Sequence, residues 1–245
     1  MEDKKVLICC PVAGFKQYAT NIWLDWIATQ TYDNFDICVC VNGKGSKELV
    51  ELFKEVEISY PDASVKRLEV LELPYSDKMS CIHNITYSRE MIRRFAVKNN
   101  YDYIFFLDND TIPFHKDAIQ KLIDRDKDVI SGLYFYKNTK QPVVIDAETN
   151  TNISLEKCED LVEKKEICEV WGFGFGCLLL SRKAFKDNEF DYGLFGDERS
   201  DDFGYCHVLE QKGIKRYFDP YVICKHFNDP EAKKDKGTTL PFYVK

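Results

Sequence analysis

The chain has 245 residues, of which 44% are hydrophobic, and its formal net charge is −7. A chain of this size and composition can bury one substantial core, so we expect a single folded domain over 1–245 rather than a disordered protein. The acidic balance gives no electrostatic reason to expect nucleic acid as the main partner, because phosphate backbones are bound by basic surfaces.

The apolar runs and the cysteines indicate where the protein acts. No run approaches the roughly 20 apolar residues that span a bilayer, so we expect no transmembrane segment and no export. Several of the ten cysteines lie in apolar, strand-like segments, and no two have CxxC spacing. Reduced, mostly buried thiols in a cytoplasmic protein are the expectation.

The first 110 residues alternate short apolar runs with amphipathic stretches. Leu49, Leu52, Phe53 and Val56, for example, recur at helical spacing. Alternating strands and helices predict a parallel sheet with helices on both faces. In chain order, we predict strands at 6–12, 35–41, 65–73 and 103–107, with helices around 18–27, 49–56 and 82–96.

The remaining chain is less regular. A helix is predicted near 117–123 and strands at 129–135 and 142–145, while the polar, acidic segment 150–165 is expected on the surface and partly helical. The predicted class is α/β, with a Rossmann-like, mostly parallel central sheet, helices on both faces and a smaller mixed region. We expect a nucleotide-binding half at 1–110 and an acceptor and catalytic half at 111–245.

The most informative feature is the apolar run 103–107, which is followed by Asp108, Asn109 and Asp110. In an extended chain the two carboxylates project to the same side, roughly 6–7 Å apart. Their mutual repulsion and loss of water are costs that a metal ion or ligand hydroxyls can offset. A strand end followed by a plain Asx turn is the alternative. The carboxyl end of a parallel strand is where such sheets bind ligands.

Five segments have an apolar run beside acidic, glycine-rich or histidine positions: 103–113, 128–134, 170–185, 200–213 and 219–226. In this order they resemble the family 2 glycosyltransferases with the GT-A fold, along nearly the whole chain. The first resembles the strand that ends in the DXD motif, and the second resembles the strand after it. The others resemble the glycine-rich acceptor segment, the acidic motif that carries the base, and the closing strand with a metal-binding histidine.

Two positions depart from that family. Asp201-Asp202 stands where many relatives have Glu-Asp, with Gly204 at a later acidic position, and Asn42-Gly43 stands where many have an aspartate. These departures leave the class intact and the identity of the donor open.

The resemblance implies transfer of a sugar from a nucleotide-diphosphate donor, with UDP or GDP, to an acceptor hydroxyl. It implies Mn²⁺ or Mg²⁺ bound by Asp110 and His226, while Asp108 contacts the ribose or the metal. Carboxylates with an imidazole suit such ions, which act as Lewis acids on the leaving group.

Asp202 is the expected general base, and Asp201 is the second candidate. Attack of the acceptor from the face opposite the leaving group would invert the configuration of the sugar. The alternative is that this acidic pair only caps a helix at 205–211.

Further residues are expected around the donor and the acceptor. Arg89 would face the donor phosphates or base, unless it is simply solvated. The aromatic Trp171 and Phe173 beside Gly172 would stack on a carbohydrate acceptor. The basic segment 233–236 is expected to be a solvated tail, with a flap that meets phosphates as the alternative. Pro11, Val12 and Ala13 are expected to line the nucleotide base through their backbone. The other predicted donor contacts are Asn42, Lys78, Asp108 and Asn109.

Rival classes fit the sequence less well. A phosphatase of the haloacid dehalogenase type also uses a DxD strand end, but its motif needs Thr or Val where this chain has Ile112. A nucleotidyltransferase needs a longer glycine-rich basic loop than 11–16. A non-catalytic sugar-binding module would lose the acids. The donor sugar, the base, the acceptor (glycan, lipid or protein), the stereochemistry and the oligomeric state are left open.

Overall fold

The structure is a computed structural model that describes residues 4–59, 68–74, 76, 78–195 and 200–227. Its strands are β1 (Val6–Ala13), β2 (Phe35–Asn42), β3 (Leu68–Glu72), β4 (Tyr103–Leu107), β5 (Thr111–Pro113), β6 (Val129–Leu133), β7 (Val144–Asp146), β8 (Cys168–Phe173), β9 (Cys177–Ser181) and β10 (Arg216–His226). Its helices are the 3₁₀ helix η1 (Gly14–Ala19), α1 (Thr20–Ala28), α2 (Ser46–Ser59), α3 (Cys81–Lys98), α4 (Ala118–Asp124), α5 (Leu155–Lys164), α6 (Arg182–Phe185), α7 (Tyr192–Phe195) and α8 (Asp201–Gln211).

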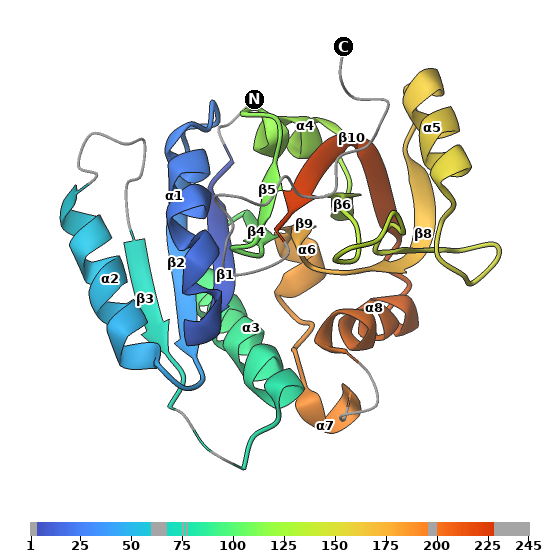
Figure 1. The fold of residues 1–245 in the computed structure, drawn as a ribbon. Coiled ribbons are helices and arrows are strands. Elements are labelled where there is room, and N and C mark those ends of the chain that lie inside the picture. Colours follow the sequence, from blue (N-terminus) through green and yellow to red (C-terminus); the bar gives the residue numbers. More distant parts are fainter. Residues whose placement is uncertain (1–3, 60–67, 75, 77, 196–199, 228–245) are drawn as a thin grey trace.

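The ten strands of the described residues join in one sheet, in the order β3-β2-β1-β4-β9-β6-β10-β8-β7, with β5 paired to β10. In Figure 1, β3 and β2 with α2 lie at the left of the view, and β8 with α5 lies at the right. The predicted α/β class is confirmed, and the strands β3, β2, β1 and β4 are parallel as expected.

The direction of the later strands is more mixed than the sequence predicts. β9 lies between β4 and β6 and is antiparallel to both, whereas β6 and β10 are parallel. Residues 177–180 are buried on both faces, which is the pattern of a central strand of either direction. Hydrophobicity alone therefore could not reveal that β9 joins the regions before and after residue 110 into one continuous sheet.

Two apolar layers cover the two faces of the sheet, because side chains alternate along each strand. Val6, Ile8, Cys10 and Val12 of β1 face the layer that contains Trp23 of α1 and the apolar stripes of α2 and α4. Their neighbours Leu7 and Cys9 face the layer that contains residues of α3, α5 and α8. The ten cysteines form no disulfide.

The acidic segment 150–165 contributes more to the core than expected. It contains α5, whose Cys158 and Leu161 are buried in the second layer. Ser154 caps its start by accepting a hydrogen bond from the Lys157 amide, and Lys165 ends it with a left-handed φ of 60°. Only the polar face of this segment lies on the surface.

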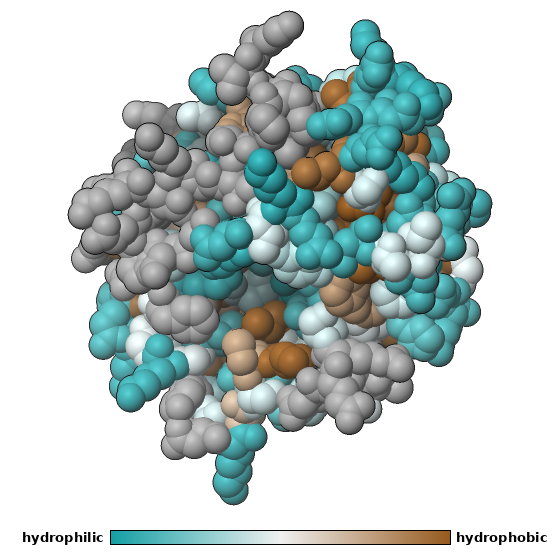
Figure 2. All heavy atoms as spheres, turned by 45° about the vertical axis from the view of Figure 1, so that its right-hand side comes forward, coloured by the Kyte–Doolittle hydropathy of each residue, from teal (hydrophilic) through white to brown (hydrophobic). Residues whose placement is uncertain are grey.

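On the face shown in Figure 2, the described residues are largely hydrophilic, and hydrophobic residues show in separate groups rather than as one continuous patch. Among the described residues, the large hydrophobic side chains classed as exposed are Tyr87 and Phe114. None of the helices in the described ranges is long and apolar enough to cross a membrane.

Candidate active site

A cavity of about 550 Å³ lies at the carboxyl ends of β1, β2 and β4. The amino-terminal part of α3 and the start of α8 complete its walls. Parallel strands bring these ends to one edge of the sheet, which explains why polar residues from distant segments meet there. The predicted residues that line it are Pro11, Ala13, Asn42, Arg89, Asp108, Asp201 and Asp202.

The three predicted donor contacts at the end of β1 do not all face the cavity. Pro11 and Ala13 line the cavity, whereas Val12 is fully buried in the core. The alternation of side chains along the strand causes this difference. Val12 therefore offers a ligand no side-chain contact, and its expected contact through the backbone stays a prediction.

Three other predicted donor contacts have different surroundings. Asn42 lines the cavity, and its amide donates to the Ser88 hydroxyl at 3.0 Å. Lys78 is exposed in the loop before α3 and does not line the cavity. Asn109 is fully buried, and its amide donates to the Lys16 carbonyl at 2.9 Å and to Thr20. Asn109 thus binds η1 and the start of α1 rather than lining the cavity.

The expectation that Asp108 and Asp110 lie on an extended chain was wrong. β4 ends at Leu107, and the chain then turns, with the Thr111 amide donating to the Asp108 carbonyl at 2.8 Å. A turn does not keep the alternation of a strand, so the two carboxylates have different partners. Asp108 lies 3.4 Å from Arg89, on the cavity wall.

Arg89 is buried, not solvated, and it joins two acidic segments. It is 4% exposed, and its guanidinium pairs with Asp201 at the start of α8 as well as with Asp108. The rings of Phe106 and Phe175 each lie with their centroid 5.0 Å from its central carbon. Its Nη1 has no hydrogen-bond partner among the described residues, although the side chain lines the cavity.

The pairing of β5 with β10 brings His226 beside Asp110. His226 is opposite Thr111 in this antiparallel pair, and the Phe227 amide donates to the Asp110 carbonyl at 2.8 Å. The His226 Nε2 lies 3.8 Å from Asp110 Oδ2. Its Nδ1 donates to the Phe135 carbonyl at 2.7 Å, which leaves Nε2 to face the carboxylate.

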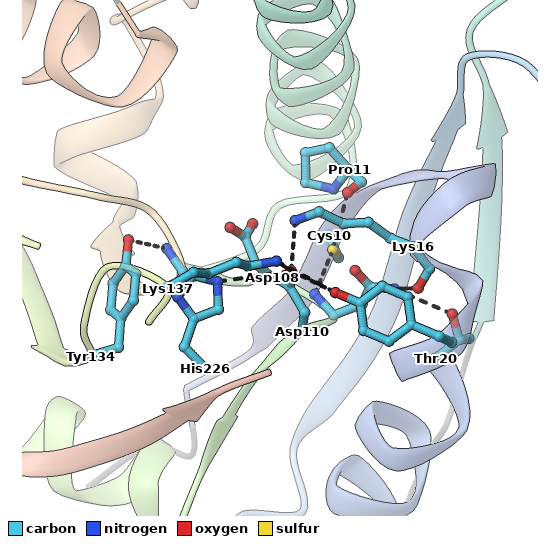
Figure 3. Close-up of polar contacts among 12 residues, drawn as sticks. Cys10, Pro11, Lys16, Thr20, Asp108, Asp110, Tyr134, Lys137 and His226 are labelled. Carbon is cyan, nitrogen blue, oxygen red and sulfur yellow. Dashed lines mark hydrogen bonds and ion pairs between the residues drawn. The ribbon is translucent and has the colours of Figure 1, made fainter. Parts of the chain in front are cut away.

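Asp110 is fully buried and surrounded by positive charge. Lys16 and Lys137 lie 3.0 and 2.7 Å from its Oδ2 (Figure 3). Burial by itself would raise the pKa of Asp110, but the contacts with His226, Lys16 and Lys137 outweigh it and hold this pKa well below its usual range.

Asp110 and His226 fit a divalent cation as two protein ligands, and Asp108, the third predicted ligand, does not join them. Its Oδ1 is buried without a partner, and the imidazole of His226 is oriented through its other nitrogen. Asp108 is not gathered with them, and nowhere in the described chain do three His, Cys, Asp or Glu side chains form a group that could hold a metal. The rest of a coordination shell would come from ligand oxygens and water.

Asp202 lies on the cavity wall in the first turn of α8. It accepts hydrogen bonds from the Ser200 hydroxyl and from the Phe203 amide. Burial and the neighbouring Asp201 carboxylate raise the pKa of Asp202 to about 7, against these hydrogen bonds and the charge of Arg89. The helix begins at Asp201, earlier than predicted, so the acidic pair forms its first turn.

The predicted acceptor residues Trp171, Gly172 and Phe173 lie on β8, and none of them lines the cavity. The β7–β8 register shifts here, with Val170 and Phe173 paired but Trp171 without an opposite residue. This bulge lets Val170 and Phe173 both face the core, so Phe173 is fully buried and unavailable to a ligand. Trp171 is half-buried and packs against Phe203, next to Asp202.

The glycines of this segment make room for Tyr134, a cavity residue. A Cβ atom on Gly174 would lie 1.9 Å from the Tyr134 hydroxyl, and one on Gly176 would lie 2.8 Å from its ring. The Gly176 amide donates to that hydroxyl at 3.1 Å. The glycines therefore let the backbone approach a buried tyrosine, not a ligand.

We expect Gly174→Ala to lower the free energy of unfolding by about 1–3 kcal/mol, because overpacking forces a buried side chain to move. Urea denaturation would measure this change. Gly193→Ala is the control, since the nearest atom to its Cβ is a carboxylate oxygen of Asp191, which can move. Equal losses in both variants would contradict the role given to Gly174.

Sequence reasoning missed Lys16, Lys137 and Tyr134. Lys16 follows the first predicted strand, and that position could have signalled it. Lys137 lies in the turn between β6 and β7, and nothing in its own segment indicates that this turn meets Asp110. The basic segment 233–236 lies outside the described residues.

Known proteins resemble this chain in fold but not closely in sequence. No protein-family profile and no curated protein sequence matches it. The crystal structure of a protein from STIV superposes on 92% of this chain and 87% of its own, with a TM-score of 0.53 and 16% identity.

Two other similar structures are larger proteins. The mannosyltransferase PcManGT from Pyrobaculum calidifontis, in complex with GDP-Man and Mn²⁺, matches 90% of this chain at TM-score 0.54 and 15% identity. GalNAc-T7 with UDP, GalNAc and Mn²⁺ matches 94% at TM-score 0.63 and 13% identity. This chain spans 56% and 45% of their lengths. Such likenesses show the fold, which is the GT-A fold expected from the sequence.

Proposed function

We propose that this protein is a metal-dependent glycosyltransferase that moves a sugar from a nucleotide-diphosphate donor to an acceptor hydroxyl. The observation that supports it best is the convergence of Asp110 with His226, and of Arg89 with Asp108 and Asp202, around one edge of a GT-A sheet. Solved proteins with this fold are complexed with GDP-Man or with UDP and GalNAc, and with Mn²⁺.

The donor would occupy the cavity, with its base near Pro11, Ala13 and Asn42 and its diphosphate toward Asp110. The unpartnered Nη1 of Arg89 gives a ligand oxygen a buried, preoriented donor. Asp110 and His226 would hold Mn²⁺ or Mg²⁺, which supplies Lewis-acid stabilisation of the leaving diphosphate. Asp108, held by Arg89, would contact the ribose.

Asp202 would take the proton from the acceptor hydroxyl as that oxygen attacks the anomeric carbon. A carboxylate with a pKa of about 7 is a stronger base than an ordinary aspartate, which suits proton removal near neutral pH. Attack from the side opposite the diphosphate gives inversion of configuration. Trp171, packed on Phe203 beside Asp202, is the acceptor contact that this arrangement favours.

Thermal unfolding with nucleotide diphosphates and metal tests this function. UDP or GDP with Mn²⁺ should raise the melting temperature, since a ligand at about 100 times its Kd adds ~2.7 kcal/mol to stability. The nucleotide that stabilises should then be released from its sugar conjugate when a suitable acceptor is added, as measured by product chromatography. A shift of the same size in EDTA would refute the metal dependence.

Asp110→Asn and His226→Gln should each abolish the part of the melting shift that depends on Mn²⁺, because each removes one of the two protein ligands. The matched control is His207→Gln, since the His207 side chain is 40% exposed on α8 and bonds to Gln211 of its own helix. Calorimetric titration with Mn²⁺ alone would check the same loss without nucleotide. If both variants bound Mn²⁺ as the unmodified chain does, the metal would have to lie elsewhere.

A further inference from the structure

Two lysines from distant segments converge on one oxygen of Asp110. Lys16 lies in η1, directly after β1, and Lys137 lies in the turn after β6. Their ammonium groups are 3.0 and 2.7 Å from Oδ2. Figure 3 shows the two side chains reaching the carboxylate from different sides of the site.

This arrangement carries more positive charge than Asp110 neutralises. One carboxylate faces two ammonium groups, and the Tyr18 hydroxyl also donates to the same Oδ2 at 3.4 Å. Donors are therefore crowded on one oxygen, while Oδ1 accepts from no described residue. Asp108 is the other carboxylate that acts on Lys16, and it already pairs with Arg89, so one of the two ammonium groups can pair with an anion while the other still neutralises Asp110.

The two lysine side chains are partly open to solvent. Their side chains are 27% and 34% exposed, whereas Asp110 is fully buried. Lysine is a compact point charge on a flexible stem, which suits phosphate oxygens that arrive from solvent. Lys16 already lines the cavity wall near Asp108, where a ligand diphosphate would enter.

We propose that Lys16 and Lys137 are exchangeable counter-ions, which neutralise Asp110 in the metal-free protein and pair with the donor diphosphate when a divalent cation takes Asp110. The diphosphate half of this inference rests on the proposed function. The two lysines thus compete with the cation for Asp110 but assist it in holding the nucleotide. This opposition distinguishes them from residues that only support the fold.

The first half of the proposal is that the lysines compete with the cation for Asp110. A titration with Mn²⁺ alone tests it, with the free ion measured by its electron paramagnetic resonance signal. Lys137→Met should bind Mn²⁺ about tenfold more tightly than the unmodified chain, because a competing positive charge is removed from the buried carboxylate. Lys137→Arg keeps the charge and should not tighten binding. Lys140→Met, at an exposed position shortly after Lys137, is the control and should bind as the unmodified chain does.

Titration with UDP and GDP at saturating Mn²⁺ tests the second half. Lys137→Met should bind the responsive nucleotide about tenfold more weakly, since a charge-assisted hydrogen bond to phosphate is lost. Lys16→Met should behave in the same way, and Lys137→Arg should keep most of the affinity. Thermal unfolding without ligands establishes that each variant is folded.

The outcomes separate this inference from the proposed function. Weaker Mn²⁺ binding by the Lys137→Met variant, or no change in either titration, overturns the exchange. Lysine-dependent nucleotide binding without any Mn²⁺ binding also overturns it, since the lysines would then replace the metal. Tighter Mn²⁺ binding with no nucleotide bound by any variant confirms the counter-ion half and refutes both the diphosphate half and the proposed donor site.

Discussion

Asp202→Asn is expected to lower the turnover number for sugar transfer by about 10²–10⁴-fold, the usual contribution of a positioned general base. Asparagine keeps an oxygen that accepts from Ser200 and from the Phe203 amide, so the start of α8 should be retained. Donor affinity should change little, because the lost function concerns the acceptor proton. Initial rates at saturating donor, with donor affinity from calorimetry, would measure both effects.

The pH dependence of the same reaction provides a second readout. Only the ionised Asp202 can accept a proton, so kcat/KM should rise with pH around a midpoint of about 7. Asp201→Asn removes the neighbouring negative charge and should move this midpoint to lower pH. A flat profile between pH 6 and pH 8 would show that another group is the base.

The free energy of unfolding should fall with rising pH, whereas kcat/KM should rise. The folded protein holds the Asp202 proton more tightly than the unfolded chain, because the pKa is raised from an ordinary value of about 4 to about 7. Between about pH 4 and about pH 7 the unfolded chain therefore binds fewer protons than the folded protein, and the free energy of unfolding falls as pH rises through this range. The Asp202→Asn variant should lack this part of the decline.

Arg89→Met should lower the free energy of unfolding by about 3–5 kcal/mol, because it leaves the buried Asp201 carboxylate without its partner. Methionine can still fill the space between Phe106 and Phe175, so the loss reports the charge rather than a cavity. Urea denaturation at pH 7 is the measurement. Nucleotide binding should fall as well, since Nη1 of Arg89 is a proposed donor contact.

A second substitution separates charge from packing. The double variant Arg89→Met with Asp201→Asn should recover most of the lost stability, because the buried Asp201 charge is then gone and Asp108, whose side chain is 26% exposed, can be solvated. Arg94→Met is the control on the same helix, since Arg94 is 69% exposed and its pair with Glu90 is worth at most about 1 kcal/mol. If the double variant were no more stable than Arg89→Met, the buried ion pair would not explain the effect.

The sequence predicted the elements better than the contacts between them. Periodicity located β1, β2, β4 and α3 closely, because each is a strongly patterned segment. It could not show that the three-residue strand β5 pairs with β10, and this pairing is what sets His226 against Asp110. The resemblance to a known family, not the pattern, is what placed those two residues together.

Local irregularities account for the remaining differences. The turn at Asp108 and the bulge at Trp171 both break the alternation on which the predicted side-chain directions depended. Lys137 illustrates a different limit, since its relevance comes from tertiary structure alone. Residues that follow strand ends were predictable as candidates, and those that arrive from distant turns were not.

The position of β9 has a consequence for synthesis of the protein. β4 leaves the ribosome long before residues 177–181, which later cover one of its two edges. Until then the nascent chain presents an open, apolar strand edge, the kind of edge that pairs with other chains. A fragment that stops at Pro113 should therefore aggregate rather than fold as an independent nucleotide-binding unit, and chaperone assistance should matter most during this interval.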